Sequence, residues 1–300
     1  MAPLFLTGAS GFVGRSLLRH FRETGTDITV LTRSPDALQR AVPRHEGWQY
    51  FAGDITRPST YAGALAGANT VLHLAAITGK APSRDYARVI HEGTRRLVSA
   101  CEDSGVSRFI FVSTIAAGFP DRRYYPYADA KARAEEVVSN SRLDWLIVRP
   151  TMVFGEGSPV LKGLAALAAA PVGLIPGAGN AMAQPIDRDD LGQILSHLAS
   201  EVPGREIIEV GGPDQLTFLD LMRRIRVKLR GRPGPMAHLP LELMRRVLAA
   251  LEPALLPVLP LTAGQLASFA NDGVARRHPR TDPFHSSLQT VDAMLATLER

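Results

Sequence analysis

The sequence predicts a doubly wound α/β fold, in which helices cover both faces of a parallel sheet. Strand-like apolar runs alternate with amphipathic, helix-like runs through the first half of the 300 residues. A glycine-rich turn over Thr7–Gly14 separates the first strand from the first helix. After Pro150 the alternation gives way to glycine- and proline-rich chain, which indicates a smaller C-terminal portion.

The elements of the first half follow from these runs in order. A strand at Leu4–Thr7 precedes a helix whose face carries Val13, Leu17 and Phe21 at spacings of four. Further strands are expected at 28–32, 49–52, 71–75, 109–113 and 145–148, and helices at 84–103 and 128–139. Such repeated β-α units require a parallel sheet with right-handed crossovers.

The second half has fewer clear elements. We expect helices over 188–200 and 218–230, the second capped by Thr217 with Asp220, and a strand at 207–210. Apolar residues at 288, 291, 295 and 298 mark a closing helix. Residues 1–155 are therefore expected to form a dinucleotide-binding domain. Residues 156–300 are expected to form mainly a substrate-binding portion, with some segments returning to the sheet.

Composition excludes several classes of protein. A single cysteine, Cys101, rules out an internal disulfide and suits a reducing, cytoplasmic compartment, and we expect it to be buried filler. The net charge is +5, but the arginines are scattered, which argues against a nucleic-acid partner. The glycine turn begins too soon after Met1 for a signal peptide.

Leu239–Leu261 is the only membrane candidate, because no other stretch is as long and as apolar. It contains four charged residues and four prolines, so it fails as a spanning helix, which needs about 20 largely uncharged residues. We expect no transmembrane segment. An interfacial helix with peripheral membrane contact and an apolar lid over a substrate both stay open.

The glycine turn carries the strongest chemical signal. Gly8, Gly11 and Gly14 follow a strand and open a helix. Glycines at this spacing let the backbone approach a diphosphate, and the helix N-terminus offers free N–H groups and a positive dipole end. This context predicts a Rossmann-type dinucleotide site, whereas the alternative is an ordinary tight turn.

Arg33 ends the second strand, where such a fold meets the adenosine ribose. A carboxylate there accepts from the 2′-hydroxyl of NAD, and an arginine suits the 2′-phosphate of NADP. The segment Leu31–Ser34 has no carboxylate, so we expect NADP, with NAD as the alternative.

Tyr127 and Lys131 share a helix face at i, i+4 in a chain with only four lysines. An ammonium beside a phenol favours the phenolate and lowers the pKa of the tyrosine, which can then exchange a proton with a carbonyl or alcohol oxygen. The alternative is a surface pair. Ser113 and Thr114 end the strand before this helix, so one hydroxyl can hydrogen-bond the reacting oxygen.

Together these features resemble the short-chain dehydrogenase/reductase superfamily, especially its extended and atypical branches, over most of the first 190 residues. Thr7–Gly14 is similar to its TGxxGxxG turn and Tyr127 with Lys131 to its YxxxK pair. The other similar segments are Gly53–Ile55 (GD-hydrophobic), His73–Ala76 (HLAA), Gly93–Thr94 (GT), Arg149–Gly155 (nicotinamide loop) and Asp189–Leu191 (late acidic step). Residues 261–266 and 271–272 loosely resemble atypical members related to an accessory subunit of respiratory complex I.

The resemblance implies roles for named residues. Tyr127 is the expected acid/base, Lys131 also holds the nicotinamide ribose, and Thr114, with Ser113 in reserve, polarises the substrate. The expected cofactor-binding residues are Gly8, Ser10, Gly11, Phe12, Val13, Arg33, Asp54, Ile55, Leu74, Ala75, Ala76, Tyr127, Lys131, Pro150 and Val153.

Three departures weaken the match to sugar-modifying members. Ile90 replaces the asparagine that usually lies three residues before the GT step. The gap from Thr114 to Tyr127 is short, and Ala116–Gly118 replaces the usual tyrosine-glycine. We therefore expect an NADP-dependent oxidoreductase acting on a carbonyl or alcohol of a small, apolar substrate. A nucleotide-sugar epimerase or dehydratase and a non-catalytic NADPH-binding structural or assembly protein are the alternatives. We expect the protein to be a monomer or a homodimer.

Overall fold

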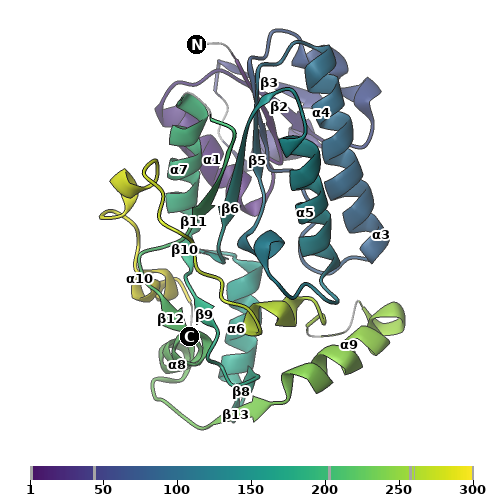
Figure 1. The fold of residues 1–300 in the computed structure, drawn as a ribbon. Coiled ribbons are helices and arrows are strands. Elements are labelled where there is room, and N and C mark those ends of the chain that lie inside the picture. The colour runs from purple at the N-terminus through teal and green to yellow at the C-terminus, as the bar shows by residue number, and fades with distance from the viewer. Residues whose placement is uncertain (1–2, 43–44, 202–203, 257–258, 260, 299–300) are drawn as a thin grey trace.

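The computed structural model describes residues 3–42, 45–201, 204–256, 259 and 261–298. Within these residues, one sheet of seven parallel strands has the order β11-β6-β5-β4-β1-β2-β3 (Figure 1). The strands are β1 (Leu4–Thr7), β2 (Ile28–Thr32), β3 (Trp48–Ala52), β4 (Thr70–His73), β5 (Arg108–Val112), β6 (Asp144–Pro150) and β11 (Glu206–Val210). The strand order reverses between β1 and β4, so the predicted Rossmann-type fold is confirmed.

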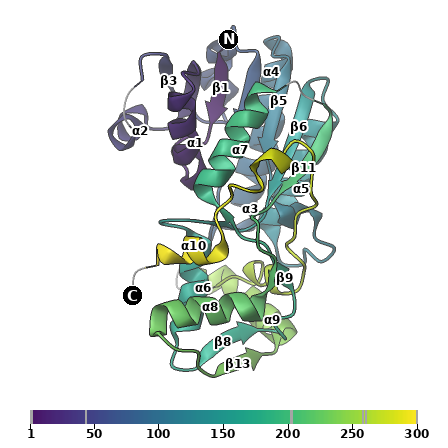
Figure 2. The same cartoon turned by 90° about the vertical axis from the view of Figure 1, so that its left-hand side faces the viewer.

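Helices cover both faces of this sheet because alternate strand residues point to opposite sides. Leu4 and Leu6 belong to one buried cluster, with α1 (Phe12–Glu23) and α7 (Arg188–Ser200), while Phe5 belongs to another. That second cluster lies under α4 (Gly93–Asp103) and α5 (Pro126–Ser139). Helix α2 (Pro35–Ala41) adds Leu38 to the first cluster. Figure 2 shows α1 beside α7.

The helix expected over 84–103 is continuous but changes its winding. It begins as α3 (Ser83–Tyr86), passes through a π-helical segment over Ala87–Glu92 and continues as α4. Ile90, the residue that departs from the family pattern, lies in the π-helical segment and is fully buried. Such segments often occur at functional sites.

The C-terminal portion has a buried cluster of its own. It contains residues of α6 (Pro159–Ala169), β8 (Gly173–Pro176), β9 (Met182–Ala183), β12 (Leu216–Thr217), α8 (Phe218–Arg230) and α10 (Val291–Ala296). Strand β13 (Met236–Leu239) pairs with β8, and α9 (Leu241–Leu255) follows it. Thr217 caps α8 by accepting from the Asp220 N–H at 3.1 Å, as predicted.

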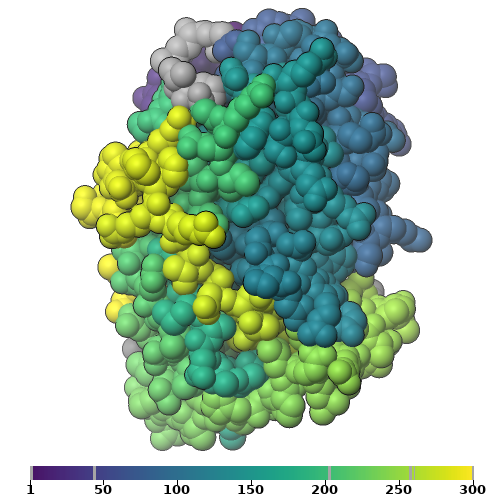
Figure 3. Space-filling model, viewed as in Figure 1, coloured from purple at the N-terminus to yellow at the C-terminus, as the bar shows by residue number. Residues whose placement is uncertain are grey.

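The C-terminal segment over residues 261–290 runs back along the molecule as a strap. Figure 3 shows it, in yellow, crossing from the region below α5 to the face beside α7. The ring centroids of Phe284 and of His197, on α7, lie 5.0 Å apart, and the Gln289 N–H donates to the Asp190 carboxylate at 2.7 Å. Across the described residues, no helix is both long and apolar enough to cross a membrane.

Candidate active site

The glycine turn packs too closely for a side chain at Gly8 or at Gly14. A Cβ on Gly8, whose φ is +78°, would lie 2.5 Å from the Ala75 nitrogen and 2.6 Å from the Leu74 carbonyl carbon. A Cβ on Gly14 would overlap the Gly8 carbonyl. Gly11 and its neighbour Ser10 are exposed at the start of α1, whose first two residues are the half-buried Phe12 and Val13. The turn is therefore folded tightly against the chain after β4, and its exposed backbone at Ser10 and Gly11 forms a cradle at the amino end of α1, a position that suits a diphosphate.

The ends of β2 and β3 form a charged corner at the same edge of the sheet. Arg33 is exposed after β2, and Asp54 lies just after β3. Burial raises the pKa of the Asp54 carboxyl, but hydrogen bonds from Thr56 and the charges of Arg33 and Arg57 outweigh it and lower the pKa. The predicted Arg33 thus has a second arginine, Arg57, near the same carboxylate.

Ile55 and the residues after β4 line the apolar side of this edge. Ile55 is buried, and a Cβ on Gly93 would lie 3.0 Å from its Cδ1 atom, so α4 packs closely here. Leu74, Ala75 and Ala76 are half-buried and follow β4 directly. The structure brings these predicted residues to one edge because all the strands are parallel.

His73, at the end of β4, links three elements through a chain of hydrogen bonds. Its Nδ1 lies 2.6 Å from Thr7 Oγ1, and its Nε2 lies 3.0 Å from Thr94 Oγ1. The Thr94 hydroxyl donates to the Ile90 carbonyl at 2.5 Å, so it accepts from a protonated Nε2. A neutral ring with its proton on Nε2 has a bare Nδ1, so the Thr7 hydroxyl donates to Nδ1 while it accepts from the Ala75 N–H.

This chain fixes the tautomer and charge of His73. Burial, with the Lys131 ammonium nearby, lowers the pKa of the imidazole to about 3, so the ring is neutral. The hydrogen bonds join the glycine turn, β4 and the π-helical segment. Sequence reasoning noted His73 and Thr94 only through the family resemblance, because a buried His between a strand-end hydroxyl and a helix hydroxyl carries no spacing signal.

Lys131 is buried on α5 and faces the end of β5. Its Nζ donates to the Val112 carbonyl at 2.7 Å and lies 4.6 Å from the centroid of the Phe111 ring. Burial lowers the pKa of the ammonium to about 7, against a smaller opposing effect of Glu135. The group therefore titrates near neutral pH.

Tyr127 lies half-buried among other tyrosines. Its ring centroid is 6.0 Å from that of Tyr86 and 5.9 Å from that of Tyr125. Burial raises the pKa of Tyr127, and the phenols of Tyr125 and Tyr86 raise it further. The expected lowering by Lys131 is therefore wrong in direction, because the Lys131 ammonium is directed to the Val112 carbonyl and burial dominates at the phenol. The proton-transfer role of Tyr127 stays a prediction.

The two hydroxyls at the end of β5 differ in their surroundings. Thr114 is half-buried, and its Oγ1 accepts from the Ala116 N–H at 3.3 Å, which leaves its proton free to donate. Ser113 is buried, and its Oγ has no hydrogen-bond partner within the described chain. Both hydroxyls thus keep a donor at this edge.

The loop after β6 carries the remaining predicted residues. Pro150 is the buried last residue of β6 instead of a residue beyond it, and Val153 lies in β7 (Val153–Phe154), paired with β10 (Ile186–Asp187). Arg149 holds β6 to α5 by donating to both oxygens of Glu135, at 2.9 and 2.6 Å.

Arg188 was not predicted. Its guanidinium carbon lies 5.1 Å from the centroid of the Phe12 ring, beside the start of α1, and it donates to the Glu156 carbonyl at 3.1 Å. Its position between two aspartates in the sequence was the available signal, because a cation among carboxylates at a helix start is unusual.

Helix α9 and the strap are tied to the loop before α5. Arg245, only 2% exposed, donates to Asp121 at 2.7 Å and to the Arg123 carbonyl at 2.8 Å. Asn271 donates to the Asp121 carbonyl at 3.1 Å. A Cβ on Gly264 would lie 2.6 Å from the Tyr124 carbonyl oxygen, in a loop where Tyr124 has φ +61°. The loop that precedes Tyr127 is thus held by two distant segments.

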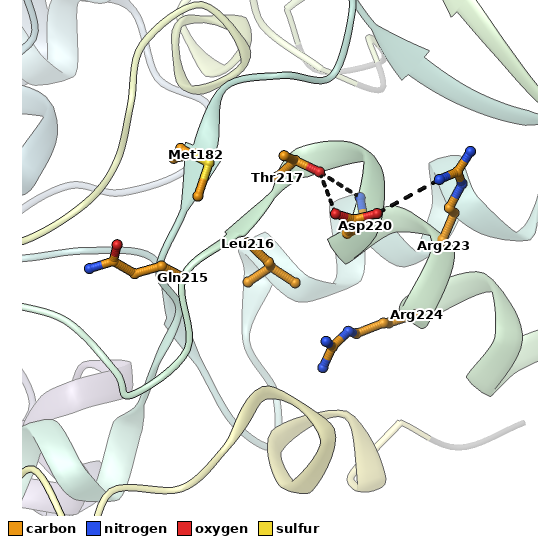
Figure 4. A pocket seen from close by; sticks show the side chains of 7 residues that line it. All are labelled: Met182, Gln215, Leu216, Thr217, Asp220, Arg223 and Arg224. Carbon is orange, nitrogen blue, oxygen red and sulfur yellow. Dashed lines mark hydrogen bonds and ion pairs between the residues drawn. The ribbon is translucent and has the colours of Figure 1, made fainter.

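A separate open cavity of about 480 Å³ lies at the start of α8. Figure 4 shows its lining side chains, Met182, Gln215, Leu216, Thr217, Asp220, Arg223 and Arg224. It shares no residue with the predicted site, so we keep the candidate active site at the sheet edge.

Comparison with known proteins agrees with this geometry. Residues 8–169 match a family described as NAD(P)H-binding. The chain belongs to this NAD(P)H-binding family. The match runs from the glycine turn through Tyr127 and Lys131, and it confirms the resemblance to the short-chain dehydrogenase/reductase superfamily.

Cys101 is buried, as expected, and burial raises the pKa of its thiol.

Two curated relatives are reductases by name. A ceramide reductase of Caulobacter vibrioides is 32% identical over 169 residues, which cover 55% of this chain and 50% of the relative. The 4-hydroxy-2-methyl-3-oxo-4-farnesyl-3,4-dihydroquinoline-1-oxide ketoreductase of Stigmatella aurantiaca is 29% identical over 169 residues, 50% of each protein. The chain thus spans about half the length of these two relatives.

A solved structure shares the fold. The double mutant of DesIV, a dTDP-glucose 4,6-dehydratase from Streptomyces venezuelae with NAD and DAU bound, aligns with a TM-score of 0.67 at 21% identity. The alignment covers 79% of this chain and 84% of that chain. At this identity the likeness concerns the fold.

Proposed function

We propose that the protein is an NADP(H)-dependent oxidoreductase that acts on a carbonyl or alcohol group of a small, apolar substrate. One observation carries the proposal: the bare cradle at Gly8, the β5 hydroxyls and the α5 face with Tyr127 and Lys131 lie at the same edge of the sheet. Ligands bind at this edge in doubly wound folds.

The residues present fit the cofactor. A diphosphate would lie at the exposed backbone of Ser10 and Gly11, at the amino end of α1. Phe12, Val13, Leu74, Ala75 and Ala76 would enclose it, with Pro150 and Val153 toward the nicotinamide. Arg33 and Arg57 would receive the 2′-phosphate of NADP, while Asp54 and Ile55 would contact the adenosine. When bound, the cofactor supplies or accepts a hydride.

The chain's own residues would handle the oxygen of the substrate. The Thr114 hydroxyl, with Ser113 in reserve, donates a hydrogen bond to the carbonyl oxygen, which strengthens as negative charge builds on it. The raised pKa of Tyr127 keeps its hydroxyl protonated, so this phenol can give its proton to that oxygen in the reductive direction. Lys131 would hold the nicotinamide ribose.

The proposal of an apolar substrate is supported by the C-terminal portion of the chain and by the names of two relatives. Residues of about 155–185, together with α9, would cover the substrate, and α9 is largely apolar. The named substrates of the two curated relatives are a ceramide and a farnesyl compound.

The proton-transfer role is tested with Tyr127→Phe. We expect this variant to bind NADPH with unchanged affinity and to lose most of its turnover, about 100-fold or more, because general acid catalysis contributes on that scale. Tyr125→Phe is the matched control, since it removes a neighbouring phenol of the same cluster. Full activity of Tyr127→Phe would remove the assigned role.

The coenzyme preference is tested by dissociation constants. NADPH is expected to bind more tightly than NADH, and Arg33→Ala is expected to weaken NADPH selectively. Tighter binding of NADH to the unaltered protein would end this part of the proposal.

Two other functions are kept because an observation favours each. The structural likeness to a dTDP-glucose 4,6-dehydratase favours a nucleotide-sugar epimerase or dehydratase, which stabilisation of the protein by UDP- or GDP-sugars in a thermal-shift screen would support. Ile90 and the exposed face of α9 favour a non-catalytic NADPH-binding assembly protein. Co-purified cofactor that no carbonyl compound oxidises would support this second alternative.

A further inference from the structure

Helix α9 presents an apolar stripe to solvent. The stripe consists of Leu243, Val247, Leu251 and Leu255, whose side chains are 60%, 47%, 39% and 42% exposed. A spacing of four residues places them along one side of the helix. Elsewhere in the described chain, exposed large apolar side chains belong to separate elements. The stripe is therefore a continuous surface and not scattered exposure of the kind every protein has.

The opposite side of α9 is firmly attached, so the exposure of the stripe is part of the fold. Arg245 is buried against Asp121, and Leu241, Met244 and Leu248 pack on the C-terminal core. Figure 1 shows the helix lying along the lower edge of the molecule, below α5. Nothing within the described chain covers the stripe.

Charge indicates what the stripe contacts. The exposed residues of α9 are Leu243, Arg246, Val247, Ala250, Leu251, Pro253, Ala254 and Leu255. The one charged residue among them is Arg246, which is basic. Arg246 is itself paired with Glu242 at 3.2 Å, but Glu242 also lies within 4 Å of Arg123 and Arg245, which share Asp121 as well. Three arginines thus face two carboxylates at the start of α9, and Glu252 accepts from the Ala263 N–H at 2.5 Å. An apolar face with a basic edge matches an anionic lipid surface.

Area argues against a second copy of the chain. The stripe from Leu243 to Leu255 is about 18 Å long at 1.5 Å per residue. With a width of about 10 Å, one helix diameter, it offers roughly 200 Å². A stable protein interface needs about 800 Å² on each partner, so the stripe is too small to hold a dimer. A single helix face of this size suits shallow insertion into a bilayer interface.

We propose that α9 is a docking surface for an anionic lipid bilayer, with the stripe inserted among the acyl chains and Arg246 at the headgroups. The end of α9 leads to the candidate active site, because Glu252 binds Ala263 next to Gly264, which contacts Tyr124 and Tyr125. Docking would thus bring the site to the bilayer; that an apolar substrate is taken up there rests on the proposed function.

The test is sedimentation of the full chain with vesicles of phosphatidylcholine mixed with phosphatidylglycerol. The unaltered protein is expected to sediment with them, and the triple variant L243S/V247S/L251S to lose about tenfold or more of its partition constant, because binding scales with inserted apolar area. The control V172S/I207S/V227S removes three similarly exposed apolar side chains elsewhere and is expected to bind normally. Arg246→Gln should weaken binding about fivefold on the mixed vesicles only.

A second measurement does not depend on the stability of a triple variant. Because Cys101 is buried, Leu251→Cys can be labelled selectively with an environment-sensitive dye, whose emission should shift to the blue with vesicles. Val227→Cys, on the exposed side of α8, should show no shift.

Three results would overturn the proposal. The unaltered protein could stay in the supernatant, or the stripe variant could bind as well as the unaltered protein. The third result is that the unaltered protein is a dimer in vesicle-free solution and the stripe variant is a monomer. The readout is sedimentation and not turnover, so this proposal and the proposed oxidoreductase activity can fail independently.

Discussion

Replacement of Lys131 by methionine should change stability in opposite directions at low and high pH. The ammonium of Lys131 has a folded-state pKa of about 7, against an ordinary lysine value of 10.5. The unfolded chain therefore binds more protons between these values, and stability rises with pH across that window. The free-energy cost of burying the charged ammonium is fully present below pH 7 and absent above pH 10.5. At about 1.4 kcal/mol for each tenfold change in proton affinity, it amounts to roughly 5 kcal/mol.

Methionine removes this penalty but leaves the Val112 carbonyl without its donor, which costs about 1–3 kcal/mol. Lys131→Met should thus be more stable than the unaltered protein by roughly 2–4 kcal/mol at pH 6 and less stable by about 1–3 kcal/mol near pH 10.5. Urea unfolding at both pH values measures the difference. Lys162→Met, at an exposed position, is the control and should change little at either pH.

Direct titration checks the cause. The chain has four lysines, so side-chain ¹³C labelling gives four signals, and one should titrate near pH 7. The reasoning is refuted if all four titrate together above pH 10, or if Lys131→Met is destabilised equally at both pH values.

Three further changes test the surroundings of the site. Gly8→Ala should weaken NADPH binding more than tenfold in calorimetry because its Cβ meets backbone atoms, whereas Gly25→Ala, also at positive φ but with open space, should not; equal effects would disprove the close approach. His73→Phe should lower the unfolding free energy by about 1–3 kcal/mol. In the unaltered protein ¹⁵N shifts should show a proton on Nε2, and a proton on Nδ1 would reverse the hydrogen-bond chain. Arg245→Met should speed proteolysis within 239–262, unlike Arg246→Met; identical digestion would show that the buried pair does not hold α9.

Much of the sheet could be predicted because central parallel strands are buried on both faces and read as apolar runs. The helices Arg188–Ser200 and Phe218–Arg230 have the predicted bounds, since each has a polar cap and an amphipathic face. Helix α6 was missed because Pro159–Ala169 is apolar on most sides, and two-residue strands such as β7 and β12 are too short for any periodicity.

Site features that depend on neighbouring residues in the sequence were predicted. Features that depend on contacts between residues far apart in the sequence were missed. The glycine turn and the strand ends are local, and the structure brings them to one edge. The direction of the Tyr127 pKa shift is different: helix spacing shows that Lys131 shares its face but not that Tyr86 arrives from another helix or that the Val112 carbonyl takes the ammonium. Arg245 was overlooked because its partner Asp121 is 124 residues away.

The attachment of the loop at Asp121 bears on how the chain acquires its native state. Asn271 and Arg245 reach this loop across 150 and 124 positions of sequence. Contacts of such separation carry a large loop-closure entropy, so they form late. On the ribosome six of the seven strands, β1 to β6, can therefore emerge and pair before the residues that hold the loop at Asp121 have been synthesised. Nascent chains of that length would hold the glycine turn and the paired strands, while the loop at Asp121 would still lack both of its attachments.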